Sequence, residues 1–255
     1  DVAVSSVMAD PENIKIINAD LDQSEAAALF SKYDLKYAPV VNHNGVLVGV
    51  LNSNDIMYVI TEEAKEDFML LGNVDADQTI HTGIFESVKN RLPWLLGAIT
   101  TASVGTTIIN SFSGTIQKLV ILSALLPMIA NLSGVAGSQA LTITVRNLST
   151  KNINKNNVFK IIFKEILTGL MNGIILATIV GLGLFIWKRN LSLSLIFAAT
   201  VLISQIVSSF IGIVIPLIIS KMKLDPAVAS GTFITASLDA LSSLVLLFMA
   251  TKFLL

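Results

Sequence analysis

Five long segments of mostly apolar residues follow one another through the C-terminal two thirds of the chain. Crossing the hydrocarbon core of a bilayer takes about 20 such residues in a helix. Each segment is long enough, and short Ser/Gly or Lys/Arg connections separate them. The pattern therefore predicts an α-helical polytopic membrane protein with five transmembrane helices, at residues 92–112, 119–139, 166–187, 191–219 and 228–255.

The first sixty residues follow a different pattern, in which short apolar runs alternate with amphipathic stretches. Short runs bounded by turn residues are typical of strands, and apolar positions at helical spacing behind an acidic cap are typical of helices. This predicts a small α/β module over residues 1–60. Its expected elements are strands at 14–17, 38–41 and 46–51, a hairpin turn at 42–45, and helices that begin near Asp22, with Glu25 completing a capping box, and near Asn52 or Ser53.

Residues 61–91 connect the two parts. The stretch 61–77 is strongly acidic, which is typical of a solvated helix face but also suits a site for hard cations, which prefer carboxylate oxygens. Residues 80–91 are expected to form an amphipathic connector at the membrane surface. We therefore expect three parts: a module over 1–60, a connector over 61–91 and a membrane domain over 92–255.

Composition agrees with a membrane protein, since 53% of the residues are hydrophobic and only 14% are charged. The chain has no cysteine, which excludes disulfides and thiolate metal sites. His43 and His81 are its two histidines, so soft-metal chemistry is not expected. Nothing at the N-terminus reads as a signal peptide.

The orientation follows from the positive-inside rule. Five spans place the two ends of the chain on opposite sides of the membrane. The loops after the second and fourth spans carry Arg146, Lys151, Lys155, Lys160, Lys164, Lys221 and Lys223, whereas the opposite side has Lys118, Lys188, Arg189 and Lys252. We expect the N-terminal module to be cytosolic and the C-terminus to be external, in a multi-pass protein of the cytoplasmic membrane.

Asp239 lies in the middle of the fifth span, where a charged side chain costs about 2.5 to 3.5 kcal/mol on insertion scales. It needs a partner or a water-filled cavity. Thr232, Thr235 and Ser242 or Ser243 share its helical face, so this stripe is a candidate wall of a hydrated path. The alternative is a buried, protonated Asp bonded to a neighbouring Ser.

Other polar positions have structural explanations. Asp225 followed by Pro226 suits an N-cap and a first helical residue. Small polar residues of the first and fourth spans commonly serve helix packing. Gly134 and Gly137 suggest close helix contact, or a break that exposes backbone carbonyls.

The first module resembles a CBS domain. The resemblance rests on a Pro-Val-Val run at residues 39–41, Gly45, Gly49 and a final Asp55. CBS domains usually work in pairs, which implies a partner module before Asp1. Many bind adenine nucleotides such as ATP through a Ser or Thr three residues before the Asp. This chain has Asn52 there and so departs from the pattern for ATP as a cofactor.

Over essentially the whole chain the sequence resembles the MgtE family of magnesium channels or transporters. Four ordered motifs carry the resemblance. They are the acidic helix at 63–67 with Leu71-Gly72 behind it, the Leu126-Pro127 to Arg146 stretch with its glycines and Ser138-Gln139, Lys164-Glu165, and Asp225-Pro226-Ala227 followed by Asp239. The chain departs from the family pattern at Ser133, Val135, Gly231 and Tyr58.

The resemblance implies a homodimer in a lipid bilayer, with the ion path on its two-fold axis and Mg²⁺ as both substrate and regulator. Asp239, Thr235 and Asp225 become the candidate pore ligands for the metal. The family's intracellular Mg²⁺ sensor sites, carried over residue by residue, fall on Asp55, Glu63, Glu66 and Asp67. No nucleic-acid partner is expected.

The function expected from the sequence is a divalent-cation channel or transporter, with Mg²⁺ as the preferred ion, and not an enzyme. One alternative is an exporter or cation-coupled carrier of another divalent metal such as Co²⁺. A second is an intramembrane enzyme that uses Asp225 and Asp239, although the motifs of such enzymes are missing. A third is a membrane sensor whose CBS module binds nucleotide.

Overall fold

The computed structural model describes residues 3, 14–149, 153, 156–222, 224–229 and 231–255. For residues 228, 229, 231 and 232 it describes the backbone alone. Lys151, Lys155 and Lys223 of the charge argument, and the side chain of Thr232, therefore lie outside the described residues. The chain divides into two compact units, Asp1–Glu66 and Asp67–Leu255, which are treated separately below.

The first unit is the small α/β module that the sequence predicts. A three-stranded sheet has the order β1 (Ile17–Asn18), β2 (Tyr37–Val41) and β3 (Leu47–Asn52), with β1 parallel and β3 antiparallel to β2. Helix α1 (Gln23–Tyr33) and the start of α2 (Ser53–Leu71) complete it. The core consists of Ile17, Ala26, Ala27, Phe30, Ala38 and Ile56.

Local polar contacts set the turns of this unit. Asn42 Oδ1 accepts hydrogen bonds from the backbone N–H groups of Asn44 and Val46, and Gly45 takes the positive φ of 74° that the hairpin requires. Strand β1 is shorter than the predicted run 14–17, because only Ile17 and Asn18 pair with β2.

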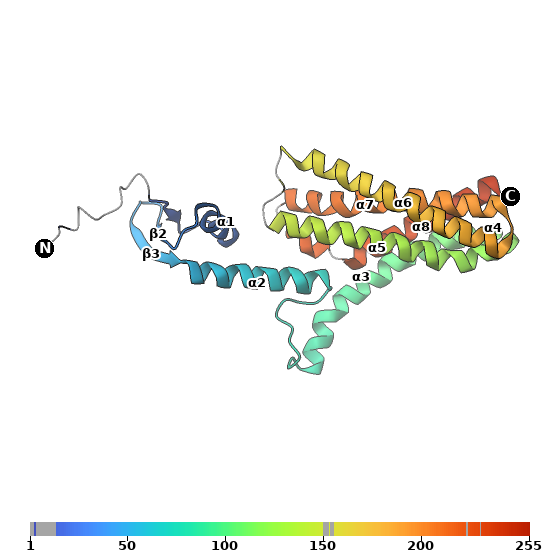
Figure 1. Cartoon of the computed structure of the whole chain (residues 1–255). Coiled ribbons are helices and arrows are strands. Elements are labelled where there is room, and N and C mark those ends of the chain that lie inside the picture. Colours follow the sequence, from blue (N-terminus) through green and yellow to red (C-terminus); the bar gives the residue numbers. More distant parts are fainter. Residues whose placement is uncertain (1–2, 4–13, 150–152, 154–155, 223, 230) are drawn as a thin grey trace. The chain divides into compact units, whose positions relative to one another are not determined.

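The second unit is helical (Figure 1). Its elements are α3 (Ile84–Ser111), α4 (Ser113–Lys118), α5 (Ile121–Ser149), α6 (Val158–Lys188), α7 (Leu191–Lys221), the 3₁₀ helix η3 (Pro226–Ala229) and α8 (Gly231–Phe253). By length and composition, five of the described helices can cross a membrane, namely α3, α5, α6, α7 and α8. The prediction of five spans is confirmed.

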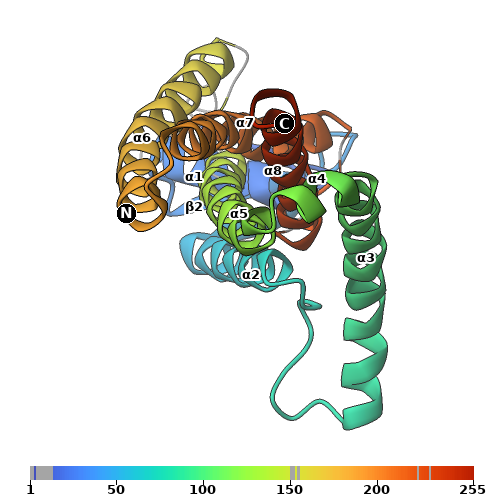
Figure 2. The ribbon, with the colours of Figure 1, turned by 90° about the vertical axis from the view of Figure 1, so that its right-hand side faces the viewer.

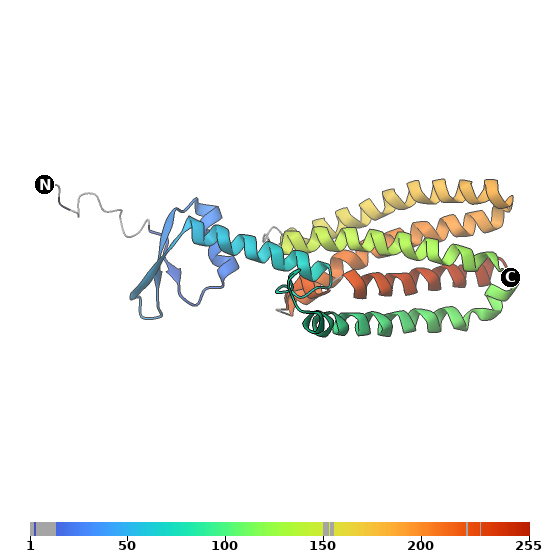
Figure 3. The same ribbon diagram turned by 90° about the horizontal axis from the view of Figure 1, so that it is seen from below.

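These helices are packed around α7 and α8. Helix α7 packs against α5, α6 and α8, while α3 packs mainly on α8 and is otherwise separate from the other long helices, as Figure 2 shows. The C-terminal end of α5, the N-terminal end of α6 and the C-terminal end of α7 lie at one end of the unit (Figure 3). Helix α4 and the C-terminus of the chain lie at the other end.

The start of the first span differs from the prediction. Residues 84–91 do not form a separate surface helix but are the first turns of α3, which continues through Pro93 to Ser111. Proline is tolerated in the first turns of a helix, and Pro93 lies further in, so the helix continues at the cost of one backbone hydrogen bond. The amphipathic segment and the span are therefore one helix.

Small residues allow α5, α6 and α7 to approach closely. A Cβ atom at Gly212 of α7 would lie 2.5 Å from the backbone oxygen of Gly137 and 2.7 Å from Ala140 Cβ, both on α5. Nearby, Ser133 Oγ and Ser208 Oγ share a buried hydrogen bond of 2.7 Å, and Gln205 Nε2 donates to the backbone oxygen of Leu132 at 3.1 Å. The buried polar groups of the fourth span thus serve helix packing, as one sequence-based reading expects.

We expect Gly212→Ala to destabilise the membrane unit. Its methyl group meets backbone atoms of α5, which cannot move without separating the helices, and such overpacking costs about 1 to 3 kcal/mol. The midpoint of thermal unfolding of the purified protein in detergent should fall by about 2 to 10 °C. Gly183→Ala is the matched control, because no atom lies within 4 Å of its added methyl group. Equal midpoints for the two variants would contradict this account of the packing.

Candidate functional site

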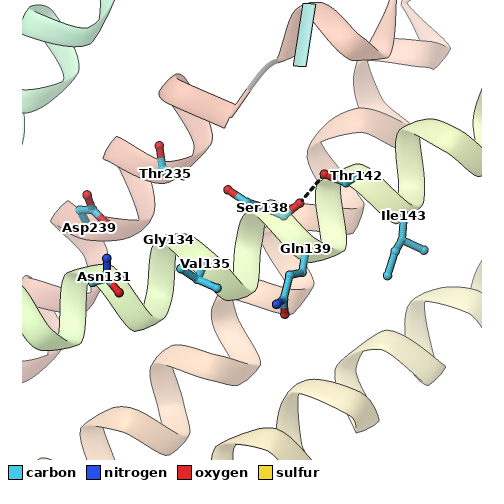
Figure 4. Close-up of a pocket in the computed structure, with 9 residues that line it drawn as sticks. All are labelled: Asn131, Gly134, Val135, Ser138, Gln139, Thr142, Ile143, Thr235 and Asp239. Atoms are coloured by element: carbon cyan, nitrogen blue, oxygen red, sulfur yellow. Dashed lines mark hydrogen bonds between the residues drawn. The ribbon is translucent and has the colours of Figure 1, made fainter. Parts of the chain in front are cut away.

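A pocket of about 570 Å³ lies between α5 and α8 in the membrane unit (Figure 4). One face of α5 supplies most of its wall and α8 supplies two side chains. Most of the lining α5 side chains are exposed on the surface of this single chain, while those of α8 are half-buried. The lining residues are Asn131, Gly134, Val135, Ser138, Gln139, Thr142 and Ile143 of α5, and Thr235 and Asp239 of α8.

The α5 wall follows from helical geometry. The seven lining positions are spaced by three, four, seven, eight, eleven and twelve residues from the first, which is the repeat of a single helix face. Four of the seven carry polar side chains that can bind water or an ion: Asn131, Ser138, Gln139 and Thr142. A helix long and apolar enough to span a membrane thus keeps one polar face toward the pocket.

Asp239 and Thr235 stand one helical turn apart on α8 and both line the pocket. The Asp239 carboxylate accepts no hydrogen bond from any residue that the structure describes. Ser242 Oγ donates instead to the backbone oxygen of Asp239 at 3.1 Å, and Ser242 and Ser243 are buried. Among the described residues, the Asp239 carboxyl is therefore not bonded to a neighbouring Ser, which was the alternative arrangement. Of the stripe members whose side chains the structure describes, Thr235 and Asp239 line the pocket and the buried Ser242 and Ser243 do not.

Two glycines of α5 bring α8 close enough to form the pocket. A Cβ atom at Gly134 would lie 3.1 Å from Asp239 Oδ1 and 3.6 Å from Thr235 Cβ. A Cβ atom at Gly137 would collide with the Leu238 side chain. The Gly-rich stretch therefore serves close helix contact, and it leaves room for the Asp239 carboxylate.

The structure does not bring Asp225 into the pocket with Asp239. Its Oδ1 accepts a hydrogen bond of 2.8 Å from the backbone N–H of Ala227, at the start of η3, and it is not among the lining residues. The side chain acts as a helix cap, which is the structural explanation that the Asp-Pro pair suggests.

Asp55 and Glu63, two candidate sensor residues, hold helices of the first unit. Asn52 Oδ1 accepts from the backbone N–H of Asp55 at 3.0 Å, and Asp55 Oδ2 accepts in return from the backbone N–H of Asn52 at 3.1 Å. This reciprocal pair is a capping box at the start of α2. Glu63 Oε1 accepts from Gln23 Nε2 at 3.2 Å and from Ser24 Oγ at 3.0 Å, which ties α2 to the start of α1.

Asp67, a third candidate, belongs to the membrane unit. Ser149 Oγ, at the end of α5, donates to Asp67 Oδ2 at 2.7 Å. Leu70 and Leu71 then pack on a buried cluster of α5, η3 and α8 side chains: Leu141, Val145, Ala227, Ile234 and Leu238. The hydrogen bond from Ser149 to Asp67 and this apolar contact attach the end of α2 to the membrane helices.

The remaining acidic residues of this helix do not assemble a metal centre within one chain. In the ranges that the structure describes, no three Asp, Glu or His side chains lie close enough to hold an ion together. Glu62 pairs with Lys65 at 2.6 Å, and the hydrogen bond and charge of this carboxylate raise the pKa of Lys65. The assignment of Asp55, Glu63, Glu66 and Asp67 as sensor ligands stays a prediction.

Sequence reasoning missed Asn131 and Thr142, which line the pocket beside the residues that it identified. The signal was present, because Asn131, Ser138, Gln139 and Thr142 recur at helical spacing within the second span. The sequence reading connects Ser138 and Gln139 with Gly134 and Gly137, but it does not extend this face to Asn131 and Thr142.

Comparison with known proteins gives matches for both units of the chain. Residues 126–249 match the MgtE family model, described as a divalent cation transporter, and residues 4–62 match the CBS domain model. The chain is 34% identical over 241 residues to the magnesium transporter MgtE of Bacillus subtilis and 30% identical over 250 residues to that of Enterococcus faecalis. These alignments cover 94% and 97% of this chain, but 53% and 55% of the relatives.

A magnesium transporter MgtE from Thermus thermophilus is 26% identical over 236 residues, which is 92% of this chain and 52% of that protein. The chain thus spans about half the length of the relatives it matches. All three relatives are named as transporters and none as an enzyme, in agreement with the expectation that the chain is not an enzyme.

We expect Glu63→Ala to loosen α1 even when no divalent cation is present. The change removes the acceptor of two side-chain hydrogen bonds, each worth about 1 kcal/mol. Amide hydrogen exchange across residues 23–33 of the intact protein should become about five-fold or more faster. Glu62→Ala is the matched control, since Glu62 pairs only with the exposed Lys65 next to it on the helix. An unchanged exchange rate in Glu63→Ala would leave Glu63 without this structural role.

Proposed function

Because the chain carries a membrane domain of the MgtE family behind a CBS domain, we propose that it conducts a divalent cation, Mg²⁺ above others, across the cytoplasmic membrane. The observation that carries this proposal is the position of Asp239. Its carboxylate lies in a pocket among polar side chains at the middle of a membrane-spanning helix, with no hydrogen bond from the described protein to occupy it. An ionisable side chain within a membrane span commonly marks an ion pathway, where its negative charge attracts the cation.

The polar lining suits Mg²⁺ in its hydrated form. Mg²⁺ gives up its water reluctantly, so proteins commonly hold it through a few carboxylates and retained waters. The pocket of about 570 Å³ offers one carboxylate, hydroxyls and amides rather than a cage of three or more acidic ligands. Asp239 would accept hydrogen bonds from the coordinated water, and Thr235 would supply a hydroxyl or a backbone oxygen one turn away.

A second copy of the chain would complete the path. The exposed positions of the α5 face include Val135, Gln139, Thr142 and Ile143, a mixture that is poorly suited to lipid. In a homodimer, the two pockets would face one another across a two-fold axis. Two Asp239 carboxylates would then flank one hydrated cation, and its double charge would offset theirs.

The distribution of charge supports a cytosolic N-terminal module. Arg146, Lys160, Lys164 and Lys221 lie at the end of the membrane unit where α5 and α7 finish, and the end of α2 packs at that same end. With Lys151, Lys155 and Lys223, which follow α5 and α7 in the sequence, the loops on this side carry seven cations against four on the other side (Lys118, Lys188, Arg189 and Lys252). The side richer in cations faces the cytosol under the positive-inside rule. The C-terminus is then external.

Cytosolic Mg²⁺ is the proposed regulator. Leu70 and Leu71 of α2 pack in the same cluster as Leu238, which is the neighbour of Asp239 on α8. A cation bound by the acidic part of α2 would therefore alter contacts that reach the wall of the pocket. The candidate ligands are Asp55, Glu63, Glu66 and Asp67, of which Asp67 lies nearest the contact between α2 and the membrane helices.

We expect Asp239→Asn to abolish Mg²⁺ flux in proteoliposomes, measured with a fluorescent Mg²⁺ indicator, because the amide keeps the shape of the side chain and removes its charge. Asp225→Asn is the matched control and should retain most of the flux, since Asn caps a helix about as well as Asp. Flux should persist when Na⁺ and proton gradients are absent. Wild-type flux in Asp239→Asn would remove the proposed ion site, and strict dependence on either gradient would favour a coupled carrier.

We further expect Gly134→Ala to lower Mg²⁺ flux several-fold while the protein remains folded. The added methyl group would lie 3.1 Å from Asp239 Oδ1, so the carboxylate would have to shift by a few tenths of an ångström and the space beside it would shrink. The comparison is with Gly183→Ala in the same flux assay, with elution volume on size exclusion as the folding control. Full flux in Gly134→Ala would show that the close approach of Gly134 and Asp239 is not needed for conduction.

A further inference from the structure

We propose that Asn131 is a selectivity-determining residue of the ion path, and that its carboxamide binds the water shell of the cation at the level of Asp239. The proposal rests on the proposed function, because it names how the same pocket recognises its ion. It adds a residue that neither the motifs of the sequence nor the matches to known proteins assign.

The position of Asn131 supports this role. It precedes Gly134 by three residues, so it lies one turn away on the same face of α5, and the Gly134 backbone faces Asp239 Oδ1. Asn131 and Asp239 line the same pocket, and Figure 4 shows both side chains at the same end of it. The two residues come from different helices, so α5 and α8 each supply a polar side chain to this end of the pocket.

The exposure of Asn131 also needs an explanation. Its side chain is exposed in a single chain, in a helix that is long and apolar enough to cross a membrane. Its carboxamide has no hydrogen-bond partner among the described residues. A free amide facing lipid is unfavourable, because hydrocarbon offers no group to replace its hydrogen bonds with water. Asn172 of α6 is exposed in the same way, so exposure alone assigns no role. Asn131 differs because it lines the pocket, where water or a hydrated ion would satisfy its amide.

The chemistry of an amide differs from that of the carboxylate beside it. The ionised Asp239 carboxylate only accepts hydrogen bonds, whereas an amide has one accepting oxygen and two N–H donors. The oxygen of Asn131 can accept from water coordinated to the ion, while an N–H group donates to a second water or to the Asp239 carboxylate. Such contacts require the ion to keep its water shell.

This requirement favours Mg²⁺ over Ca²⁺. Mg²⁺ holds its waters in a regular octahedron and releases them reluctantly, while Ca²⁺ takes six to eight oxygen ligands in a flexible arrangement. A neutral amide placed for second-shell contacts recognises the ordered water of Mg²⁺. A carboxylate at the same position would instead compete with the water for direct coordination and would suit Ca²⁺ better.

The test measures Mg²⁺ and Ca²⁺ flux in proteoliposomes of the full chain, and the block of Mg²⁺ flux by hexaamminecobalt(III). This ion has the size and geometry of hydrated Mg²⁺ but cannot exchange its ligands, so it reports only outer-shell contacts. Asn131→Leu should weaken the block about three- to ten-fold, which corresponds to one hydrogen bond of about 1 kcal/mol, and should lower the Mg²⁺/Ca²⁺ flux ratio. Asn131→Asp should lower that ratio further.

Asn131→Gln and Asn172→Leu are the matched variants. Gln keeps the amide, so the block and the flux ratio should return toward the wild type. Asn172 is exposed on α6 and does not line the pocket, so its replacement should change neither quantity. A loss in Asn131→Leu that Gln restores, even a complete loss of flux, supports the proposal.

Two results would overturn it. One is an unchanged block and ratio in Asn131→Leu, and the other is an equal loss in the Leu and Gln variants, which would indicate packing rather than recognition. Either result, together with abolished flux in Asp239→Asn, would remove the role of Asn131 and leave the proposed function intact. Normal flux in Asp239→Asn would instead remove the proposed function.

Discussion

The central constraint on this membrane unit is that a carboxylate in the middle of a span must stay in contact with water. Leaving it in hydrocarbon costs several times the thermal energy, and nothing in the described protein neutralises Asp239. The fold meets the constraint with a polar face on the neighbouring helix. Gly134 and Gly137 let that helix approach α8 until the carboxylate lies against its backbone, and the polar side chains of α5 border the space that remains.

Close approach of α5 and α8 depends in turn on α7. Gly212 of α7 meets the Gly137 backbone from the other side, and the buried Ser133–Ser208 hydrogen bond joins the two helices within the same stretch of α5. The small residues of the second span therefore work on two faces. One face packs into α7, and the other forms the pocket, so a larger side chain on either would disturb the Asp239 site.

Much of this could be predicted from the sequence, because hydrophobic length alone defines a span. The five spans and the fold of the first unit are confirmed, and Asp239 was identified from its cost in a bilayer. The extent of α3 was not predicted, because the change from an amphipathic to an apolar pattern near residue 92, together with Pro93, suggests a boundary that the helix does not have. Asn131 was not predicted because a single amide in a span costs far less free energy than a charge, so its cost does not distinguish it from a packing residue.

The acidic residues of the first unit show a different limit of sequence reasoning. A carboxylate that caps a helix and a carboxylate that binds a cation are the same residue types in the sequence. Near the start of a helix, they can also occur at the same positions relative to the first helical residue. Asp55 and Glu63 fit the sensor pattern, yet both accept hydrogen bonds from their own unit. The hydrogen-bond partner distinguishes the two roles. For Glu63 that partner is Ser24, which lies 39 residues away, and the sequence does not show that the two side chains meet.

The contact between α2 and the membrane helices offers the proposed regulation a physical route to the pocket that Asp239 lines. Leu238 is fully buried, adjoins Asp239 and lies in the same apolar cluster as Leu70 and Leu71. Close-packed side chains transmit displacement, because a void or an overlap is costly. Leu238 also lies against Gly137 of α5, so a shift of the end of α2 that displaces Leu238 would disturb the contact between α5 and α8. Because Asp239 adjoins Leu238 on α8, such a disturbance would reach the pocket that its carboxylate lines.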